Sequence, residues 1–149
     1  MESFIGSTFT RGISSTKVSI EQVLQADVVL LLFSGKWCPP CNGFAPVIKN
    51  FYNNVNKGCI GDKKRVEIVF ISCDNSIEEY KSHASEFPYA CISFDDPKIV
   101  DLQDALEIEN IPVVTLLRKD GTIAKENIRQ IIQTKGINCF DDIRVASQK

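Results

Sequence analysis

The segment Trp37-Cys38-Pro39-Pro40-Cys41 decides how the rest of the chain is interpreted. It follows the unbroken apolar run 28–33 and precedes an amphipathic segment that extends to about Val55. A run that is apolar on both faces predicts a buried central strand with cover above and below it. The chain therefore places two cysteines where a strand passes into a helix, an arrangement typical of redox sites. At a spacing of three residues both sulfurs share one helical face, near enough for a disulfide.

The order of residues in this segment gives the two thiols different tasks. An unperturbed thiol is only about 3% ionised at pH 7, yet the thiolate is the attacking form. If Cys38 is the helix N-cap, Pro39 and Pro40 fill the first two helical positions and offer no N–H. The Cys38 sulfur then accepts the Cys41 N–H and lies at the positive end of the helix dipole. We predict Cys38 as the exposed attacking thiolate and Cys41, deeper in the helix, as the resolving thiol; Trp37 shields the pair and offers an apolar contact to a partner.

Composition favours one globular domain over residues 1–149. The chain has 149 residues, of which 44% are hydrophobic and 24% charged, values that suit a single core. A net charge of -2 gives no reason to expect nucleic-acid binding. No apolar run reaches the roughly 18 residues of a membrane helix. Because residues 1–17 lack an apolar signal core, we expect a cytoplasmic protein, and a monomer.

The remaining cysteines do not predict a metal site. They are scattered, and the only histidine of the chain, His83, forms no close pair of ligands with any of them. Three of the four lie in or beside apolar segments, as free buried thiols often do. We therefore expect neither a metal nor an organic cofactor. The four are Cys59, Cys73, Cys91 and Cys139.

The chain as a whole predicts an α/β fold. Strands alternate with helices, and a hairpin at Asp120-Gly121 and a closing helix follow, so the sheet should be mixed, with a parallel centre and an antiparallel edge hairpin, flanked by helices on both faces. Pro46 lies within the helix after the cysteines, which either tolerates it or bends there so that the cysteine turn projects. The predicted strands are 9–13 (an edge strand), 28–33, 66–72, 90–94, 113–117 and 122–125. The predicted helices are 20–24 capped by Ser19, 39–55, 76–87 stopped by Pro88, 97–106 capped by Asp96, and a last helix from an Asn127 cap to Gly136.

One proline outside the helix is a further candidate. Ile111-Pro112 stands just before a predicted strand, where an X–Pro bond is more often trans, and only about 5–6% of such bonds in folded proteins are cis. The residues alone do not make it functional.

With these motifs the chain resembles the tryparedoxin/nucleoredoxin family of the thioredoxin superfamily over about residues 25–135. The family carries the same Trp-Cys-Pro-Pro-Cys motif, and Gly43-Phe44-Ala45-Pro46 stands where it typically has Gly-Phe-Thr-Pro. The resemblance implies a thioredoxin-like fold and dithiol–disulfide exchange. It also implies that Pro112 is cis beside the cysteines, that substrate backbone docks against Ile111, and that Arg129 lies near the active site. Further matching positions are Phe51-Tyr52, Val69-Phe70, Asp74, Phe87-Pro88, Phe94 and Gly121.

The chain also departs from that family. Cys73-Asp74-Asn75 replaces the family's Trp-Asp-Glu, and Asn75 removes an acidic charge that would favour the cationic thiol trypanothione. The reductant is therefore left open among trypanothione, glutathione and a thioredoxin-reductase system. Cys73 either fills the space of the missing tryptophan or forms a regulatory disulfide. Tyr89 stands where the family often has tryptophan, and Leu32 where thioredoxins carry a buried aspartate.

The residues from 95 to 109 are strongly acidic, with Lys98 as the one basic residue among the acids. Such a run is usually a solvated face; the alternative is that it steers basic partners or a cationic reductant. Its acidic members are Asp95, Asp96, Asp101, Asp104, Glu107 and Glu109.

Three candidate functions follow from the sequence. The first is a thiol–disulfide oxidoreductase that reduces protein disulfides, those of peroxiredoxins among them, through a Cys38–Cys41 cycle. The second is a nucleoredoxin-type module that binds partners in a redox-dependent way with little turnover. A bacterial envelope reductase is a third, and the absence of a signal core argues against it.

Overall fold

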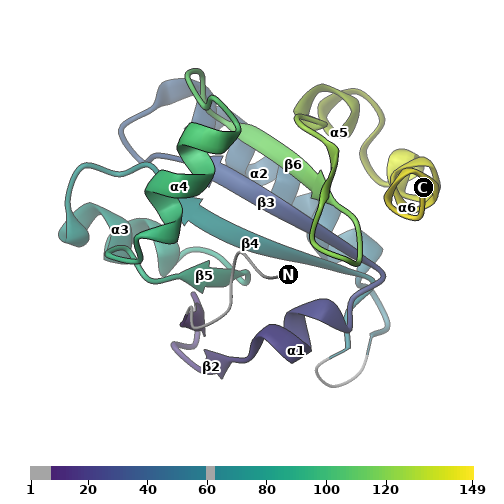
Figure 1. Ribbon diagram of the computed structural model, residues 1–149, viewed down its shortest axis with the longest axis horizontal. Helices are drawn as coiled ribbons and strands as arrows, with labels where there is room; N and C mark the ends of the chain where they lie inside the picture. The colour runs from purple at the N-terminus through teal and green to yellow at the C-terminus, as the bar shows by residue number, and fades with distance from the viewer. Residues whose placement is uncertain (1–7, 60–62) are drawn as a thin grey trace.

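A computed structural model describes residues 8–59 and 63–149 (Figure 1). The predicted α/β fold is confirmed, because one mixed seven-stranded sheet runs in the order β2-β1-β5-β4-β3-β6-β7 with helices against it. The strands are β1 (Phe9–Arg11), β2 (Lys17–Val18), β3 (Val28–Ser34), β4 (Val66–Ser72), β5 (Ala90–Ile92), β6 (Val113–Leu117) and β7 (Ile123–Lys125). The helices are α1 (Ile20–Leu24), α2 (Pro39–Val55), α3 (Ile77–Ala84), α4 (Lys98–Ala105), α5 (Arg129–Lys135), the 3-10 helix η2 (Gly136–Cys139) and α6 (Phe140–Ser147).

The central strands bring three loops to one end of the sheet, the end at which β3 and β4 finish. β3 and β4 pair in parallel, from Val28 with Val66 to Ser34 with Ser72, so the loops that follow both strands leave the sheet at the same end. β6 pairs with β3 in the antiparallel sense, with Val113 opposite Phe33. The segment that precedes β6 therefore arrives at this same end, where the cysteine loop begins.

Two hydrophobic clusters fill the space on the two faces of the sheet. Every residue of β3 is buried, and alternate side chains enter opposite clusters, Leu30 on one face and Leu31 on the other. The cluster of Leu30 receives α2, α5 and α6, and that of Leu31 receives α1 and α4. Figure 1 shows α1 and α4 in front of the sheet and α2 behind it. This two-sided cover explains why the strand is apolar throughout.

The N-terminal hairpin is fastened to the sheet by a buried ion pair. Arg11 in β1 donates to the Glu67 carboxylate at 2.8 Å, and the Glu67 side chain is 1% exposed. Gly12 lies so close to the chain after α3 that an added Cβ would be 2.1 Å from the Ala84 carbonyl oxygen. A strand lies within the predicted 9–13, as β1 (Phe9–Arg11), but the prediction that it is an edge strand was wrong, because it pairs with β5 on one side and with the outermost strand, β2, on the other. Residues 1–7 of the N-terminal prediction lie outside the described residues.

Two predicted helix boundaries in the middle of the chain were wrong. α3 ends at Ala84 rather than at 87, because the Phe87 carbonyl accepts the Ile13 N–H and its backbone belongs to the contact with the hairpin. The N-cap of α4 is Pro97, and Asp96 instead accepts the Lys98 N–H within the preceding turn.

At the C-terminal end, the helix after Asn127 is not the last one. Asn127 lies one residue before the N-cap, Ile128, and its Oδ1 accepts the Arg129 and Val114 N–H groups. Gly136 does end this helix, at a φ of 55°, where glycine is favoured. α6 follows, and it was not predicted.

Candidate functional site

The cysteine segment forms the end of the β3–α2 loop and the first turn of α2. Cys38 is the N-cap, with extended backbone angles, and Pro39 and Pro40 open the helix. The Cys41 N–H donates to the Cys38 sulfur at 3.3 Å, as the position of the two prolines predicts. The sulfur of Cys38 thus occupies the place that a capping side chain normally takes, at the positive end of the helix dipole.

The prediction that Cys38 is exposed was wrong. Cys38 is 4% exposed and Cys41 2%, so both residues are buried and the difference between them is small. The reason is the loop before β6, whose Ile111 carbonyl accepts the Cys38 thiol at 3.6 Å. Trp37, at 51% exposure, forms the outer part of the site instead.

The deeper thiol is held in its protonated form. Burial, and after it the hydrogen bond with the Cys38 side chain, raise the pKa of Cys41 to about 12. Below that pH, Cys41 is a thiol rather than a thiolate. A protonated thiol is a poor nucleophile, so Cys41 is the less suited of the two to make a first attack on a disulfide.

The structure brings Ile111 and Pro112 to the cysteines. The Ile111–Pro112 bond is cis, Pro112 is buried, and the Ile111 carbonyl contacts Cys38 as described above. Ile111 is half-buried, which leaves part of its side chain available to a partner.

Arg129 is not placed at the cysteines by any contact. It is half-buried at the start of α5, and its backbone N–H donates to Asn127. Among residues 8–59 and 63–149, its guanidinium forms no hydrogen bond or ion pair.

Cys73 lies at the same sheet edge, directly after β4. Its sulfur accepts the Gln103 side-chain amide at 3.4 Å, and burial raises its pKa to about 11. Its backbone N–H donates to Ser34, and its carbonyl accepts the Trp37 indole N–H at 2.8 Å. Cys73 thus packs half-buried against the loop that carries the motif.

Asp74 also contacts that loop, and the sequence did not single it out as a site residue. Its Oδ1 accepts the Lys36 backbone N–H at 2.6 Å, two residues before Cys38. Its Oδ2 accepts the Ser72 hydroxyl at 2.6 Å and contacts His83 Nδ1 at 3.1 Å. The signal for it was a polar residue just after a buried strand, at the sheet edge where sites form.

The other departures from the family pattern are placed as follows. Asn75 is exposed and donates its backbone N–H to the Glu79 side chain. Tyr89 is fully buried, in edge-to-face contact with Tyr52 at 5.1 Å, and burial raises its pKa. Leu32 is buried in the cluster that receives α2, where it offers no proton to the cysteines.

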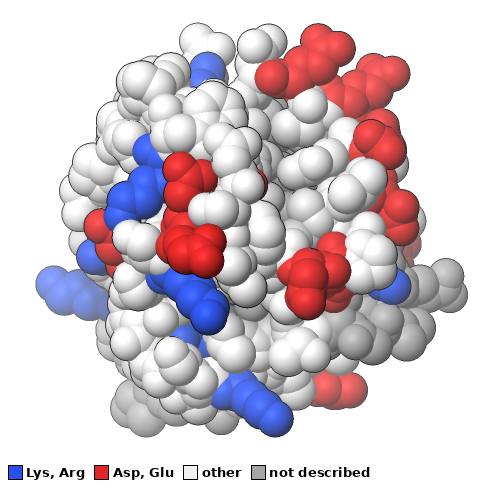
Figure 2. Space-filling view, turned by 90° about the vertical axis from the view of Figure 1, so that its left-hand side faces the viewer, with Lys and Arg blue, Asp and Glu red and all other residues white. Residues whose placement is uncertain are grey.

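The acidic run 95–109 is largely a solvated surface. Five of its six acids are exposed, and Asp96 is half-buried. Figure 2 shows most of the acidic side chains of its face gathered along the right-hand side, and lysine and arginine mainly on the left.

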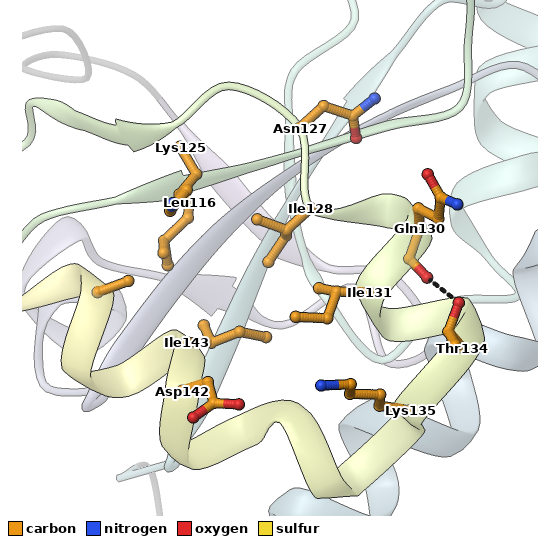
Figure 3. Close-up of a pocket in the computed structure, with 11 residues that line it drawn as sticks. Leu116, Lys125, Asn127, Ile128, Gln130, Ile131, Thr134, Lys135, Asp142 and Ile143 are labelled. Carbon is orange, nitrogen blue, oxygen red and sulfur yellow. Dashed lines mark hydrogen bonds between the residues drawn. The ribbon is translucent and has the colours of Figure 1, made fainter.

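A cavity of about 590 Å³ opens between β6, α5 and α6 (Figure 3). Its apolar wall is formed by Ile128, Ile131 and Ile143, with the charged ends of Lys135 and Asp142 at its margin. None of the predicted site residues lines it, so this cavity is separate from the cysteine pair.

Neither a metal cluster nor a membrane span is found in the part of the chain that the structure describes. No three His, Cys, Asp or Glu side chains converge there as ligands. No described helix combines the length and the apolar character needed to cross a membrane.

Comparison with known proteins places these features in a family. The model of a family described as thioredoxin-like matches residues 25–123. Tryparedoxin of Trypanosoma brucei brucei is 32% identical over 111 residues, which cover 70% of this chain and 74% of that protein. Nucleoredoxin-like protein 1 of Homo sapiens is 25% identical over 89% of this chain and 64% of its own length. The chain spans only 22% and 24% of two plant nucleoredoxins, from Arabidopsis thaliana and Oryza sativa.

Solved structures agree on the fold. Tryparedoxin from Trypanosoma brucei superposes with a TM-score of 0.76 at 23% identity, covering 91% of this chain and 93% of that one. Thioredoxin from Wuchereria bancrofti gives a TM-score of 0.74 at 28% identity, with 94% of each chain covered.

Proposed function

The chain belongs to the thioredoxin-like family, as a distant relative of tryparedoxins and nucleoredoxins, and we propose that it is a thiol–disulfide oxidoreductase that reduces protein disulfides. The observation that carries the proposal is the hydrogen bond from the Cys41 N–H to the Cys38 sulfur at the start of α2. It directs a backbone N–H donor at the Cys38 sulfur, at the start of a helix, while burial keeps the Cys41 thiol protonated.

The proposed reaction proceeds in two exchanges. The Cys38 thiolate attacks one sulfur of the target disulfide, a mixed disulfide forms, and the other target sulfur leaves as a thiolate that takes up a proton. Cys41 then loses its proton and attacks the Cys38 sulfur, which releases the second target thiol. The target gains two electrons, and Cys38 and Cys41 are left as a disulfide.

Trp37, Ile111 and Pro112 are the proposed docking surface. The target backbone would lie against Ile111, whose carbonyl accepts the Cys38 thiol while no target is bound. Trp37 is the exposed apolar side chain beside the pair. Pro39 and Pro40 support the site by leaving the first N–H of the turn to Cys41. A role for Arg129 rests on the family resemblance alone.

A thiol reductant must return the Cys38–Cys41 disulfide to the reduced form, which takes two electrons from one dithiol or from two monothiols. One related structure is a tryparedoxin II complexed with glutathionylspermidine. By analogy, we propose trypanothione, two molecules of glutathione, or a thioredoxin-reductase system as the reductant, and disulfide-containing proteins such as peroxiredoxins as targets. The acidic run 95–109 supports a cationic member of this set.

The alternative is a nucleoredoxin-type binding module with low turnover. The burial of Cys38 favours it, because a sulfur under the Ile111 carbonyl is less accessible to a target than an exposed one. The reduction of insulin disulfides with dithiothreitol as electron donor separates the two. Turnover in the wild type that is lost in Cys38→Ser supports the oxidoreductase, and negligible wild-type turnover together with stable partner binding contradicts it.

Targets can be identified with the resolving thiol removed. Cys41→Ser leaves the mixed disulfide on Cys38 intact, so partners should be recovered covalently and released by dithiothreitol. Cys38→Ser is the matched control and should recover none of them.

A further inference from the structure

We propose that His83 and Asp74 are positioning residues that hold the β3–α2 loop and thereby keep Cys38 in its reactive geometry. The inference deepens the proposed function and rests on it for the reaction served. It begins with the Asp74 carboxylate, which receives the Lys36 N–H on one oxygen and Ser72 and His83 on the other. Asp74 is 8% exposed, so these partners replace water.

The carboxylate is ionised in this network. Burial alone would raise the pKa of Asp74, but the hydrogen bonds of His83, Ser72 and the Lys36 amide lower it below its usual range. An ionised carboxylate has only lone pairs to offer, so the hydrogen in the contact must reside on His83 Nδ1. His83 therefore donates to Asp74 at 3.1 Å.

His83 is fixed in place by aromatic packing. It is 3% exposed near the end of α3, with its ring 4.9 Å from that of Phe70 and 4.8 Å from that of Phe87. Phe70 belongs to β4, so the imidazole is anchored to the central sheet. Asp74 consequently receives its bond from a donor that cannot turn away.

The loop is bound by two successive residues at once. Asp74 accepts the Lys36 N–H, and the neighbouring Cys73 carbonyl accepts the Trp37 indole. Cys38 comes next, and its own N–H donates to the Gly35 carbonyl at 3.1 Å. A shift of the Lys36 backbone would therefore move Cys38, the N-cap whose sulfur accepts the Cys41 N–H. The geometry couples α3 to the reacting sulfur through Asp74, although neither His83 nor Asp74 touches it.

The chain offers variants that isolate this role. D74N keeps the shape of the side chain but removes its charge. Its NH₂ group then replaces one acceptor oxygen and faces a hydrogen-bond donor. H83F fills the space between the rings without a donor, whereas H83N places an amide nitrogen where Nδ1 lies. S82A is the matched control, because Ser82 on the same helix binds Lys36 only through the exposed amine at 2.6 Å.

The first measurement is independent of turnover: the rate at which iodoacetamide alkylates Cys38 at pH 7, followed by mass mapping. Loss of one hydrogen bond to a charged group is worth about tenfold in rate if the loop depends on it. We expect D74N and H83F to react about tenfold more slowly, and H83N and S82A at nearly the wild-type rate. R11M, which breaks the ion pair at the other end of β4, should lower stability and leave the rate unchanged.

The second measurement is exchange of the Lys36 amide hydrogen, compared with that of Leu31 in the centre of β3. In D74N and H83F the Lys36 exchange should accelerate about tenfold relative to Leu31.

The outcomes separate the two proposals. Rates within twofold of the wild type in D74N overturn the positioning role, whatever happens to H83F, because the near-isosteric variant is expected to fold. If D74N and H83F slow the alkylation of Cys38 but the wild type does not reduce insulin, the positioning role stands and the oxidoreductase function is wrong. If the wild type reduces insulin and D74N and H83F both do so at the full rate, the oxidoreductase function stands and the positioning role is wrong.

Discussion

The indole N–H of Trp37 donates a 2.8 Å hydrogen bond to the carbonyl oxygen of Cys73. This bond is made by the backbone of Cys73. Any residue at position 73 would supply it as long as the loop keeps this conformation. The thiol itself is engaged elsewhere, by Gln103 at 3.4 Å. The backbone of Cys73 thus holds Trp37 in place, and its thiol can be replaced without removing that hydrogen bond.

The first prediction concerns that chemistry. Because burial raises the pKa of Cys73 to about 11, the thiol is protonated and slow at neutral pH. Mild oxidation at pH 7 should give a Cys38–Cys41 disulfide with Cys73 reduced, and Cys73 should enter disulfides only as the pH approaches 11. Mass mapping of the oxidised protein measures this, and a Cys73 disulfide at pH 7 would favour the regulatory role instead.

The second prediction is a loss of stability in alkali. The pKa of Cys91 is raised to about 12 by burial, well above that of an unfolded thiol, so the folded protein keeps a proton that the unfolded chain loses. The contribution is complete below about pH 8.5 and declines as the pH rises toward 12. Cys41, whose pKa is also about 12, acts in the same direction.

Urea unfolding between pH 9 and 11 measures the effect. The free energy of unfolding should fall by about 1.4 kcal/mol per pH unit for Cys91 alone. Cys91→Ala should lower stability at every pH through its cavity, yet reduce the slope by that amount. An unchanged slope would mean that Cys91 is not protonated in the folded state at these pH values.

The third prediction tests the buried ion pair between Arg11 and Glu67. Arg11→Met leaves the carboxylate of Glu67 buried without its cation and should cost about 3–5 kcal/mol. Glu67→Met should cost less, because the guanidinium of Arg11 retains 18% exposure and the Pro88 carbonyl as a partner. Denaturant unfolding of both single variants and the double variant measures the coupling; equal costs of the single variants would argue against this asymmetry.

The fourth prediction compares two glycines. Gly12→Ala would place a Cβ 2.1 Å from the Ala84 oxygen and 2.4 Å from that of Phe87, so the backbone contact between the hairpin and the chain after α3 must open. We expect a loss of at least about 1–3 kcal/mol. Gly43→Ala, in α2 with no atom within 4 Å of the new Cβ, should gain up to about 1 kcal/mol. Thermal unfolding measures both, and a stable G12A variant would show that the contact is adaptable.

The sequence predicted the elements around the cysteines well because their signals are local. The apolar run of β3, the capping position of Cys38 and the Asp120-Gly121 turn each depend on a few adjacent residues. The sequence also carried a signal for α6. Cys139, Ile143 and Ser147 recur every four residues, as on one face of a helix, and all three are buried. It was missed because no capping side chain marks its start: the N-cap, Cys139, makes no side-chain cap hydrogen bond.

The pairings that were missed depend on the fold. Arg11 and Glu67 are 56 positions apart, and only the order of strands brings them together. Asp74 and His83 are nine apart across a loop and a helix, where no periodicity relates them. The burial of Cys38 likewise depends on the Ile111 carbonyl, 73 positions away.

Trp37 is the only tryptophan of the chain, and it is half-exposed in the loop that carries the reacting thiols. All the indole fluorescence of this protein therefore originates within one residue of Cys38. Oxidation of the pair, or a partner that covers the indole, should change the emission without any label. Trp37 is thus an optical probe placed at the pair itself, and stopped-flow fluorescence should follow each exchange of the proposed cycle in real time.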